Sequence, residues 1–432
     1  MIKKCAFTLT LLAGLAILWS CSSPVGDDDG EQAATPVIDI DAGTYYGAQL
    51  VTISCATAGA TIRYTTDGSE PTASSAVYSD FVPVTRSMTL KAKAISSGKT
   101  DSEIASRALT IHYASYGDVD GAPCYWIDET RHMLPLPSGA TWGGVHSIRV
   151  TDGETFIVGI VSTPDDSLPY CWTNDVGSTF PTVSGAQFFN MAYSLSTSGS
   201  DWYIPGDYDS LDDSSNRPCY WKNGNLVTLA IPSGYDNGAT AEDVNFSGGD
   251  ILVTGRVWRW EEVGVACYWR NGSCTILTGG APSDLNCFAQ DILVSGDDVY
   301  VTGFVSTPND GGSYERPCLW KNGQFQYLGG QALASGGYRA GWMYMDGSDL
   351  YLGGYIYDII NGNWVMTPMY WKNGILVEPS FPDSSSGGVW WFEKRGTKVI
   401  PCGDRTTAAG HEDCYWVDGT YHGTAFMNRS VD

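Results

Sequence analysis

The chain is short of charge, and of positive charge most of all. Only 17% of its 432 residues are charged, and 24 basic residues stand against 48 acidic ones, so that the formal net charge is −24. Such a charge repels a phosphate backbone, and no basic stripe concentrates positive potential locally. We therefore predict that nucleic acid is not a partner.

Histidine is scarce as well, and the known catalytic signatures are missing. None of the five His pairs with another at a metal-binding spacing, and the chain has no serine elbow, phosphate-binding loop or Cys–His signature. We expect no cofactor and no metal. An Asp-rich stretch at 207–213 could hold calcium, but a solvated loop is the preferred interpretation.

What is abundant indicates β structure. The sequence holds 16 Trp and 25 Tyr, which favour strands, and 51 Gly and 20 Pro, which supply turns. Its length exceeds what one core usually supports. We therefore expect an all-β protein with more than one domain.

The N-terminus has the features of an export signal. Lys3 and Lys4 precede an apolar run at 6–19 that is too short for a comfortable membrane span. The run ends in Leu-Trp-Ser-Cys at 18–21, which resembles the lipobox of bacterial lipoproteins. That resemblance implies a signal peptide at 1–20, lipidation of Cys21 and a flexible tether at 21–33, which places the protein in the bacterial cell envelope, at the outer membrane or cell surface. The alternative is an ordinary secretory signal with an incidental Cys.

Residues 34–113 read as a small sandwich. Short alternating runs at 51–54 and 61–64 are bounded by Gly or polar turns. The stretch GATIRYTTDGSEPT at 59–72, with a later strand at 90–94, closely resembles the chitobiase/β-hexosaminidase C-terminal domain. This immunoglobulin-like module is appended to carbohydrate-active enzymes and surface proteins and is not their catalytic part. The resemblance implies a spacer or accessory role, with direct glycan contact as the alternative.

From residue 114 to the end one pattern recurs, an aromatic strand that ends in Trp. The repeated residues lie 45 to 51 residues apart and are Trp126, Trp172, Trp221, Trp269, Trp320, Trp371 and Trp416. This period suits four short strands per unit, and Asn-Gly pairs after the Trp indicate tight hairpins. We predict a β-propeller, with seven blades preferred and six possible. The earliest unit lacks an obvious first strand, and ring closure by a blade shared between the two chain ends is not evident.

The repeated positions are expected to pack rather than bind. Strict repetition of Trp suits contacts between blades. Five Cys occupy the position two before the Trp, and equivalent positions on neighbouring blades should lie too far apart to bridge, so buried free thiols are expected. Cys402 and Cys414 could still meet across one hairpin.

One unit departs from the Asn-Gly rule. Its stretch at 173–180, TNDVGSTF, resembles the Asp-box of sialidases and related propellers. The resemblance implies a turn between third and fourth strands that the Asp side chain closes, without chemistry. A sialidase is not indicated, because only Arg149 and Arg339 lie near the starts of first strands.

Candidate ligand-binding residues come from the propeller mouth, where loops enter first strands and join second to third strands. Two aligned columns vary from unit to unit, as an asymmetric ligand would require, although satisfied edge positions are the competing interpretation. The candidates are His146, Tyr193, Glu242, Asp243, Gln290, Asp291, Trp342, Trp390 and Trp391. Loop aromatics could stack on sugar rings or anchor a protein, namely Trp142, Trp258, Trp260 and Trp364.

These features favour one function over two others. The leading hypothesis is a surface-anchored lipoprotein whose propeller binds a glycan or protein partner, with the sandwich as spacer or accessory module. The alternatives are a propeller glycoside hydrolase or lyase acting on extracellular polysaccharide, which would need a carboxylate pair, and a structural envelope protein.

Overall fold

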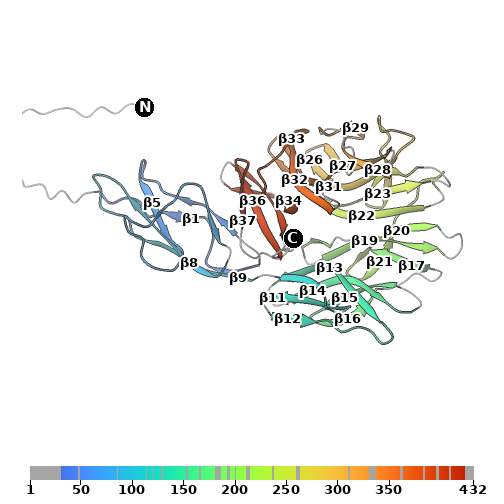
Figure 1. The fold of residues 1–432 in the computed structure, drawn as a ribbon, viewed down its shortest axis with the longest axis horizontal. Coiled ribbons are helices and arrows are strands. Elements are labelled where there is room, and N and C mark those ends of the chain that lie inside the picture. The colour runs from blue at the N-terminus through green and yellow to red at the C-terminus, as the bar shows by residue number, and fades with distance from the viewer. Residues whose placement is uncertain are drawn as a thin grey trace, which may run out of the picture.

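The computed structural model shows an all-β protein (Figure 1). It describes residues 31–46, 49–84, 86–112, 114–119, 121–127, 130–151, 154–164, 167–180, 186–191, 195–199, 201–210, 215–235, 238–258, 263–309, 312–329, 337–360, 363–382, 385–395, 398–407 and 410–423. The expected signal peptide and Cys21 lie outside these residues. No helix in the described part is long and apolar enough to cross a membrane.

The described residues of the sandwich form nine strands. Its main sheet has the order β2-β9-β8-β5-β6, with β2 (Gly43–Tyr46), β9 (Ala105–His112), β8 (Met88–Ile95), β5 (Thr61–Thr65) and β6 (Ala76–Val77). Two strand pairs complete it, β1 (Val37–Ile38) with β4 (Ile53–Ser54) and β3 (Gln49–Val51) with β7 (Val82–Val84). The predicted runs at 61–64 and 90–94 fall in strands, whereas the run at 51–54 divides at Thr52 between the end of β3 and the start of β4.

Alternation along β8 explains the sandwich core. Leu90, Ala92 and Ala94 are fully buried, whereas Lys91 and Lys93 between them are half-buried. Successive side chains of a strand point to opposite faces, so the apolar ones enter the core with residues such as Val51.

The strands of the C-terminal part fall into seven units, each with one repeated Trp. Unit 1 comprises β10 (Ala114–Val119), β11 (Ala122–Ile127) and β12 (Thr130–Met133). Unit 2 comprises β13 (Trp142–Thr151), β14 (Glu154–Ser162), β15 (Ser167–Thr173) and β16 (Val176–Thr179). Unit 3 comprises β17 (Ala186–Met191), β18 (Ser196–Ser198), β19 (Asp201–Ser210), β20 (Asn216–Lys222) and β21 (Asn225–Thr228).

The remaining units have four strands each. Unit 4 comprises β22 (Gly238–Ser247), β23 (Asp250–Trp258), β24 (Val265–Arg270) and β25 (Ser273–Ile276), and unit 5 comprises β26 (Asn286–Ser295), β27 (Asp298–Asn309), β28 (Gly312–Lys321) and β29 (Gln324–Tyr327). Unit 6 comprises β30 (Gly337–Asp346), β31 (Asp349–Ile360), β32 (Asn363–Lys372) and β33 (Ile375–Val377), and unit 7 comprises β34 (Ser386–Arg395), β35 (Lys398–Thr407), β36 (Gly410–Val417) and β37 (Thr420–Gly423).

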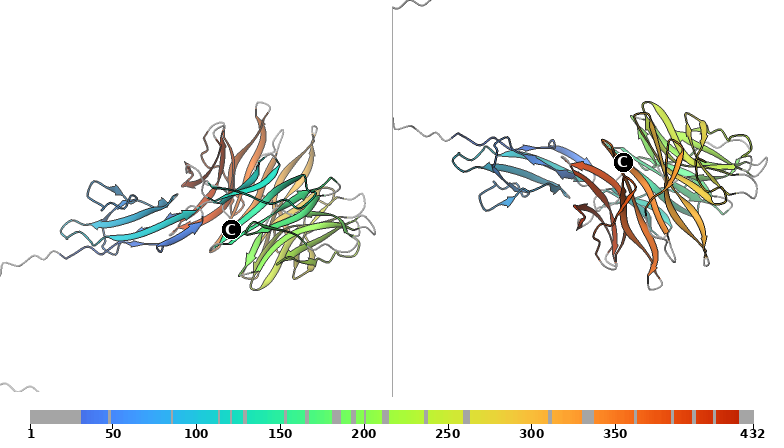
Figure 2. Two further views of the ribbon diagram at one scale, coloured as in Figure 1. Left: turned by 90° about the horizontal axis from the view of Figure 1, so that it is seen from below. Right: turned by 90° about the horizontal axis from the view of Figure 1, so that it is seen from above.

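The units follow one another around a common centre, from teal through green and yellow to red, with the sandwich to one side next to β37 (Figure 1). The two views of Figure 2 show the sandwich projecting sideways from the propeller. The predicted propeller is confirmed, and among the described residues unit 1 has no first strand, as predicted. The described strands of units 1 and 7 share no sheet, so the number of blades in a complete ring stays a prediction.

The predicted Asn-Gly hairpins form and do more than turn the chain. In unit 3, Asn223 has a φ of 50° and Gly224 one of 79°, as a two-residue hairpin turn requires. Asn223 Oδ1 accepts a hydrogen bond from the backbone N of Trp202 at 2.9 Å, and its Nδ2 donates to Asp201 at 2.6 Å. Lys222 pairs with the same Asp at 2.7 Å. The clamp between second and third strands recurs at Asn271, Asn322 and Asn373.

The hairpin of unit 2 corrects the expectation for the Asp-box-like stretch. Asn174 and Asp175 both have positive φ, 49° and 64°, so Asp175 stands at the glycine position of the turn. Asn174 Oδ1 accepts from the Thr155 backbone N at 2.9 Å and thus makes the clamp. Asp175 does not close the turn; from its position the carboxylate reaches unit 1 and accepts from the Tyr125 hydroxyl at 2.7 Å.

The repeated Trp side chains pack between units, as predicted. The six from Trp172 to Trp416 are at most 1% exposed. Four indole N–H groups donate to backbone carbonyls in the connection from the preceding unit, at 2.6 to 2.8 Å; they are Trp172 to Pro135, Trp269 to Ala230, Trp371 to Gly329 and Trp416 to Ser380. Each of these four Trp therefore joins its own sheet to the chain that enters it.

The cysteines are unbridged. All ten in the described residues are free and eight are buried. Cys402 faces Tyr415 in the strand register, and Cys414 faces Gly403, so these two do not meet across their hairpin. The prediction of buried free thiols is confirmed for the repeated column, which lies opposite small glycines such as Gly255 and Gly303.

The sandwich covers the outer face of unit 7. In five earlier units the residue just before the repeated Trp packs into the core of the next unit, namely Tyr125, Tyr220, Tyr268, Leu319 and Tyr370. The equivalent Tyr415 packs with Leu50 and Phe81 of the sandwich instead, its ring 5.5 Å from that of Phe81. Lys398 pairs with Asp80 at 2.8 Å beside them. The sandwich thus occupies the place of a next unit.

Candidate functional site

One of the two aligned columns of candidate positions coincides with a series of β-bulges. In five first strands the register shifts at one residue, which leaves two residues opposite one; the extra residues are His146, Glu242, Gln290, Gly341 and Trp390. A bulge bends the strand and redirects its side chains. Tyr193, the candidate of unit 3 in the same column, lies outside the described residues.

A repeated glycine in the second strand produces the bulge. Gly303, for example, faces Ala289, and a Cβ added there would lie 1.8 Å from the carbonyl O of Phe288. The same close approach, within 2.0 Å, occurs at Gly159, Gly255, Gly354 and Gly403. Only glycine permits it, so the glycine column was the available sequence signal for the bulges.

Threonine side chains fix the bulged segments. Thr254 and Thr302 are fully buried in second strands. Their hydroxyls donate to the carbonyl O of Gln290 at 2.8 Å and of Ala340 at 3.1 Å, each in the next unit. A buried hydroxyl would be costly without such a partner. The bulges of units 5 and 6 are therefore held by the preceding units.

Asp291 ties three units together. Its Oδ2 accepts from the Met343 backbone N of unit 6 at 2.8 Å. Its Oδ1 accepts from its own neighbour Ile292 at 2.6 Å and from Asn245 Nδ2 of unit 4 at 3.4 Å. Burial raises the pKa of Asp291 to about 8, and the negative charge of Asp243 adds to the rise. This carboxyl therefore links units 4, 5 and 6 through hydrogen bonds.

Aromatic and arginine side chains form a continuous row across units 4 to 7 at the predicted mouth. We call it the mouth row; it consists of Arg256, Phe288, Phe304, Arg339, Tyr355, Trp390 and Trp342. Three of these residues directly follow the repeated glycine of the second strand, and two of the other four, Phe288 and Arg339, lie near the starts of first strands. The row therefore lies at the end where loops enter the first strands.

Each member contacts the next. The Arg256 guanidinium lies 4.3 Å from the Phe288 ring, which stacks on Phe304 at 4.4 Å. The Arg339 guanidinium lies 5.0 Å from the same Phe304. Tyr355, opposite Arg339 in the register, approaches Trp390 at 5.4 Å, and Trp390 meets Trp342 edge-on at 4.6 Å.

The far end of the row is open to solvent. Trp342 is 41% exposed, and Trp364 on β32 is 62% exposed. Tyr357 links them, since its ring lies 5.6 Å from Trp364 and 6.2 Å from Tyr355. Together Trp342, Trp390, Tyr355, Tyr357 and Trp364 form what we call the aromatic end.

An ion pair borders the aromatic end. Arg339 donates from Nε and a terminal nitrogen to both carboxylate oxygens of Glu315, at 2.5 and 2.7 Å. Burial alone would lower the pKa of Arg339, but this pairing raises it, so the guanidinium stays charged. Burial and then the Glu315 charge raise the pKa of Tyr357, whose hydroxyl stays neutral.

Only some of the predicted residues meet. The structure joins Trp342 to Trp390 and places the charge of Asp243 beside Asp291. His146 lies apart in unit 2, where burial lowers its pKa. Glu242 is exposed and accepts from Thr240 at 3.1 Å.

The predicted position of Arg149 is wrong, and Trp391 lies away from the mouth row. Trp391 packs against the cluster that joins the sandwich to unit 7, because the bulge at Trp390 sends the two side chains to different neighbours. Arg149 lies in the second half of β13, at the end opposite the mouth, where it faces Phe156 in the register.

The structure places some of the predicted loop aromatics and part of the Asp-rich stretch. Trp142, 39% exposed, begins β13, and Trp258 is half-buried; Trp260 lies outside the described residues. Asp207 belongs to β19, is buried and accepts from Asn216 at 2.7 Å. Among the described residues no three His, Cys, Asp or Glu gather as metal ligands.

Sequence reasoning missed most of the mouth row. Arg256, Phe304 and Tyr355 share one position, the residue after the second-strand glycine. Alignment on that glycine would have found them. Their mutual contacts, which cross from unit to unit, have no signal in a single sequence.

The fold and site define an all-β protein in which an immunoglobulin-like sandwich precedes a β-propeller. The model of the chitobiase/beta-hexosaminidase C-terminal domain family matches residues 40–106, within the sandwich. No curated protein matches the chain.

Solved structures with some likeness are distant. A polysaccharide lyase, Uly1, has a TM-score of 0.41 at 11% identity, over 74% of this chain and 91% of that one. The β-propeller domain of the Trilobed protease from Pyrococcus furiosus has 0.31 at 10%, over 67% and 97%. A DUF4784 family protein from Bacteroides caccae has 0.27 at 9%, over 90% and 95%. Nothing about activity follows from likeness at this level.

Proposed function

We propose that this protein is an envelope lipoprotein whose propeller binds a glycan at the aromatic end of the mouth row. The observation that carries the proposal is the exposure of Trp342 and Trp364 at the two limits of a connected set of aromatic rings. A contiguous group of aromatic rings open to water marks an interaction site more than a single exposed ring does, and the flat apolar faces of such rings suit the C–H face of a sugar ring.

The polar groups beside these rings support a glycan ligand. The paired Arg339 and Glu315 supply donors and acceptors within the same surface, and sugar hydroxyls need such groups for orientation. The sandwich family is one that accompanies carbohydrate-active enzymes, which favours a glycan over a protein. The lipid anchor follows from the lipobox-like residues 18–21 and would hold both domains at the membrane surface.

Replacing Trp342 and Trp364 with Ala should weaken glycan binding. Each stacking contact contributes about 1 kcal/mol, so W342A/W364A should bind about tenfold more weakly or worse. We would measure affinity electrophoresis of the unlipidated mature chain in gels containing glycol chitin, xylan, galactomannan, pullulan, alginate or pectin.

W142A is the matched control, because Trp142 is similarly exposed but belongs to unit 2. It should migrate like the unchanged chain. Equal retardation of W342A/W364A and the unchanged chain, or no retardation by any of the six polysaccharides, would overturn the proposal.

Catalysis is the competing proposal. Asp291 has the raised pKa that a general acid uses, but its carboxyl is engaged by groups of three units, which favours a structural role. Release of reducing sugar or unsaturated product from the same polysaccharides, lost in D291N, would replace binding by catalysis.

A further inference from the structure

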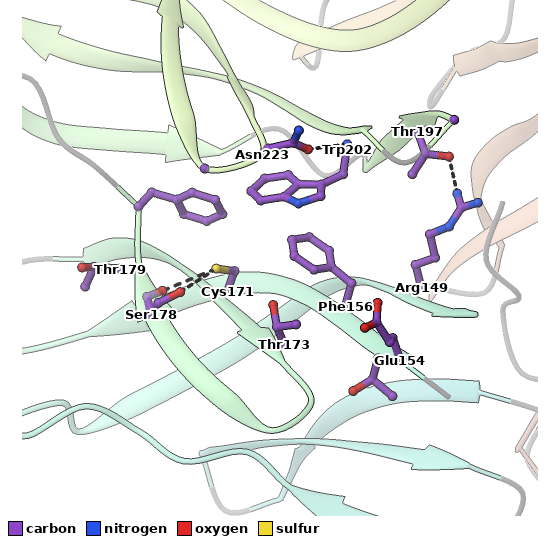
Figure 3. A pocket seen from close by; sticks show the side chains of 14 residues that line it. Arg149, Glu154, Phe156, Cys171, Thr173, Ser178, Thr179, Thr197, Trp202 and Asn223 are labelled. Carbon is purple, nitrogen blue, oxygen red and sulfur yellow. Dashed lines mark hydrogen bonds between the residues drawn. The ribbon is translucent and has the colours of Figure 1, made fainter. Parts of the chain in front are cut away.

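A cleft of about 610 Å³ opens between units 2 and 3. It lies at the end of the sheets that carries the Asn-Gly turns, opposite the mouth row. Figure 3 shows Phe156 of unit 2 and Trp202 of unit 3 facing one another in its middle. Their rings are 4.5 Å apart, and both are half-buried.

The cleft exists because unit 2 lacks a large residue that the other units have. The residue before the repeated Trp is Tyr or Leu in six units, namely Tyr125, Tyr220, Tyr268, Leu319, Tyr370 and Tyr415, and it fills the space toward its neighbour. In unit 2 this residue is Cys171, a much smaller side chain that lines the cleft. Trp202 fills only part of the space.

A second departure leaves the Phe156 ring uncovered by a lysine. In units 3, 5 and 6 the residue after the repeated Trp is a Lys that lies 5.1 to 5.3 Å from the ring of a second-strand Tyr. Phe156 occupies that Tyr position, and the residue across from it is Thr173. Glu154 stands where the other units have the Asp that pairs with this Lys.

Hydroxyl groups and the charged side chains of Arg149 and Glu154 surround the two rings. Thr173, Thr179 and Ser178 are exposed on one side, and Thr197 on the other accepts from Arg149 at 2.5 Å (Figure 3). Glu154 also lines the cleft. Aromatic faces at the floor with hydroxyl and charged groups at the rim are the lining that sugar rings require, and the volume lies in the range of small-ligand sites.

We propose that this cleft is a second ligand site, which binds a short oligosaccharide independently of the mouth row. Phe156 and Trp202 would contact the C–H face of one sugar ring, and the rim hydroxyls would bond its OH groups. The site is built by the two departures of unit 2 from the repeat.

Restoring the repeat should close the site. In C171Y/T173K the aromatic side chain would fill the cleft, and the introduced ammonium would lie over Phe156 beside Glu154, as in units 3, 5 and 6. We would record saturation-transfer NMR of the mature chain with cellotetraose, chitotetraose, mannotetraose, xylotetraose and maltotetraose at millimolar concentration. At least one should give a signal that persists in W342A/W364A and disappears in C171Y/T173K.

The mouth variant separates the two proposals. Two results would overturn the cleft proposal: a signal that is lost in W342A/W364A but kept in C171Y/T173K, or no signal from any of the five sugars in W342A/W364A. Neither result would count against ligand binding at the mouth row. The midpoint of thermal unfolding of C171Y/T173K should not fall. If that variant fails to fold, F156A replaces it. Binding by F156A equal to that of the unchanged chain would also overturn the cleft proposal.

Discussion

Single residues at the centre of the propeller connect units that are far apart in the sequence. Asp291 receives hydrogen bonds from units 4 and 6 as well as its own, and Thr254 and Thr302 reach the next unit in the same way. Buried polar groups of this kind specify one arrangement of packed elements because every partner must be in place. The titration of Asp291 therefore reports on the packing of the units.

The free energy of unfolding should fall as pH rises from about 4 to about 8. The unfolded pKa of Asp is about 3.9, and the folded pKa of Asp291 is about 8. The folded state thus binds the proton more tightly, and the stability that this contributes is lost as pH rises through the folded pKa. D291N should flatten the dependence by a few kcal/mol across this range.

Urea unfolding at several pH values would measure this effect. D297N, an exposed Asp on the following turn, is the control and should keep the slope of the unchanged chain. An unchanged slope in D291N would show that Asp291 does not titrate in this range.

At the scale of elements, units 2, 4, 5, 6 and 7 share a bulged first strand. The repeated glycine of the second strand lets the first strand approach to a distance that a Cβ would prohibit. The bulged residue itself varies, from His146 to Trp390. Backbone geometry is therefore constant while the side chains at the mouth can differ.

G303A should destabilise the fold strongly, by more than about 3 kcal/mol, because the added Cβ would meet the Phe288 carbonyl. G341A should change stability by about 0.5 kcal/mol or less, since a Cβ there would meet only Gln290 Oε1 at 3.9 Å. Urea unfolding followed by Trp fluorescence compares the two. Similar midpoints for both variants would contradict the close-approach explanation.

At the scale of the whole molecule, the sandwich is part of the propeller's packing. Leu50 and Phe81 cover Tyr415 on the face that a next unit would cover, and Trp126 in unit 1 is half-buried rather than enclosed. A spacer held by a flexible joint would not show such a contact. The position of the sandwich is set by unit 7.

F81A should lower the free energy of propeller unfolding by about 1 to 3 kcal/mol, because the side chain that packs on Tyr415 is removed. The sandwich contains no Trp, so the fluorescence change on unfolding reports the propeller alone. V37A, on an exposed sandwich strand, is the control. Independent unfolding of the two domains, with no effect of F81A on the Trp signal, would contradict the coupling.

Local patterns predicted much of this architecture. The Trp period, the Asn-Gly hairpins and the sandwich strands depend on residues near one another in sequence, so their physical causes can be read directly. The contact of Phe81 with Tyr415, and the row from Arg256 to Trp342, depend on which distant strands become neighbours. For the candidate site, the sequence pattern aligned the positions that the structure shows as bulges, but the division of Trp390 and Trp391 between two neighbours depends on the bulge itself.

Under the export proposed above, the unpaired thiols have a consequence for folding. Eight of the ten free cysteines are buried, so folding shields them from oxidants. A molecule that opens in an oxidising compartment exposes many thiols at once, and non-native disulfides then compete with refolding. In such a compartment, slow opening, more than equilibrium stability, would decide how long the molecule survives.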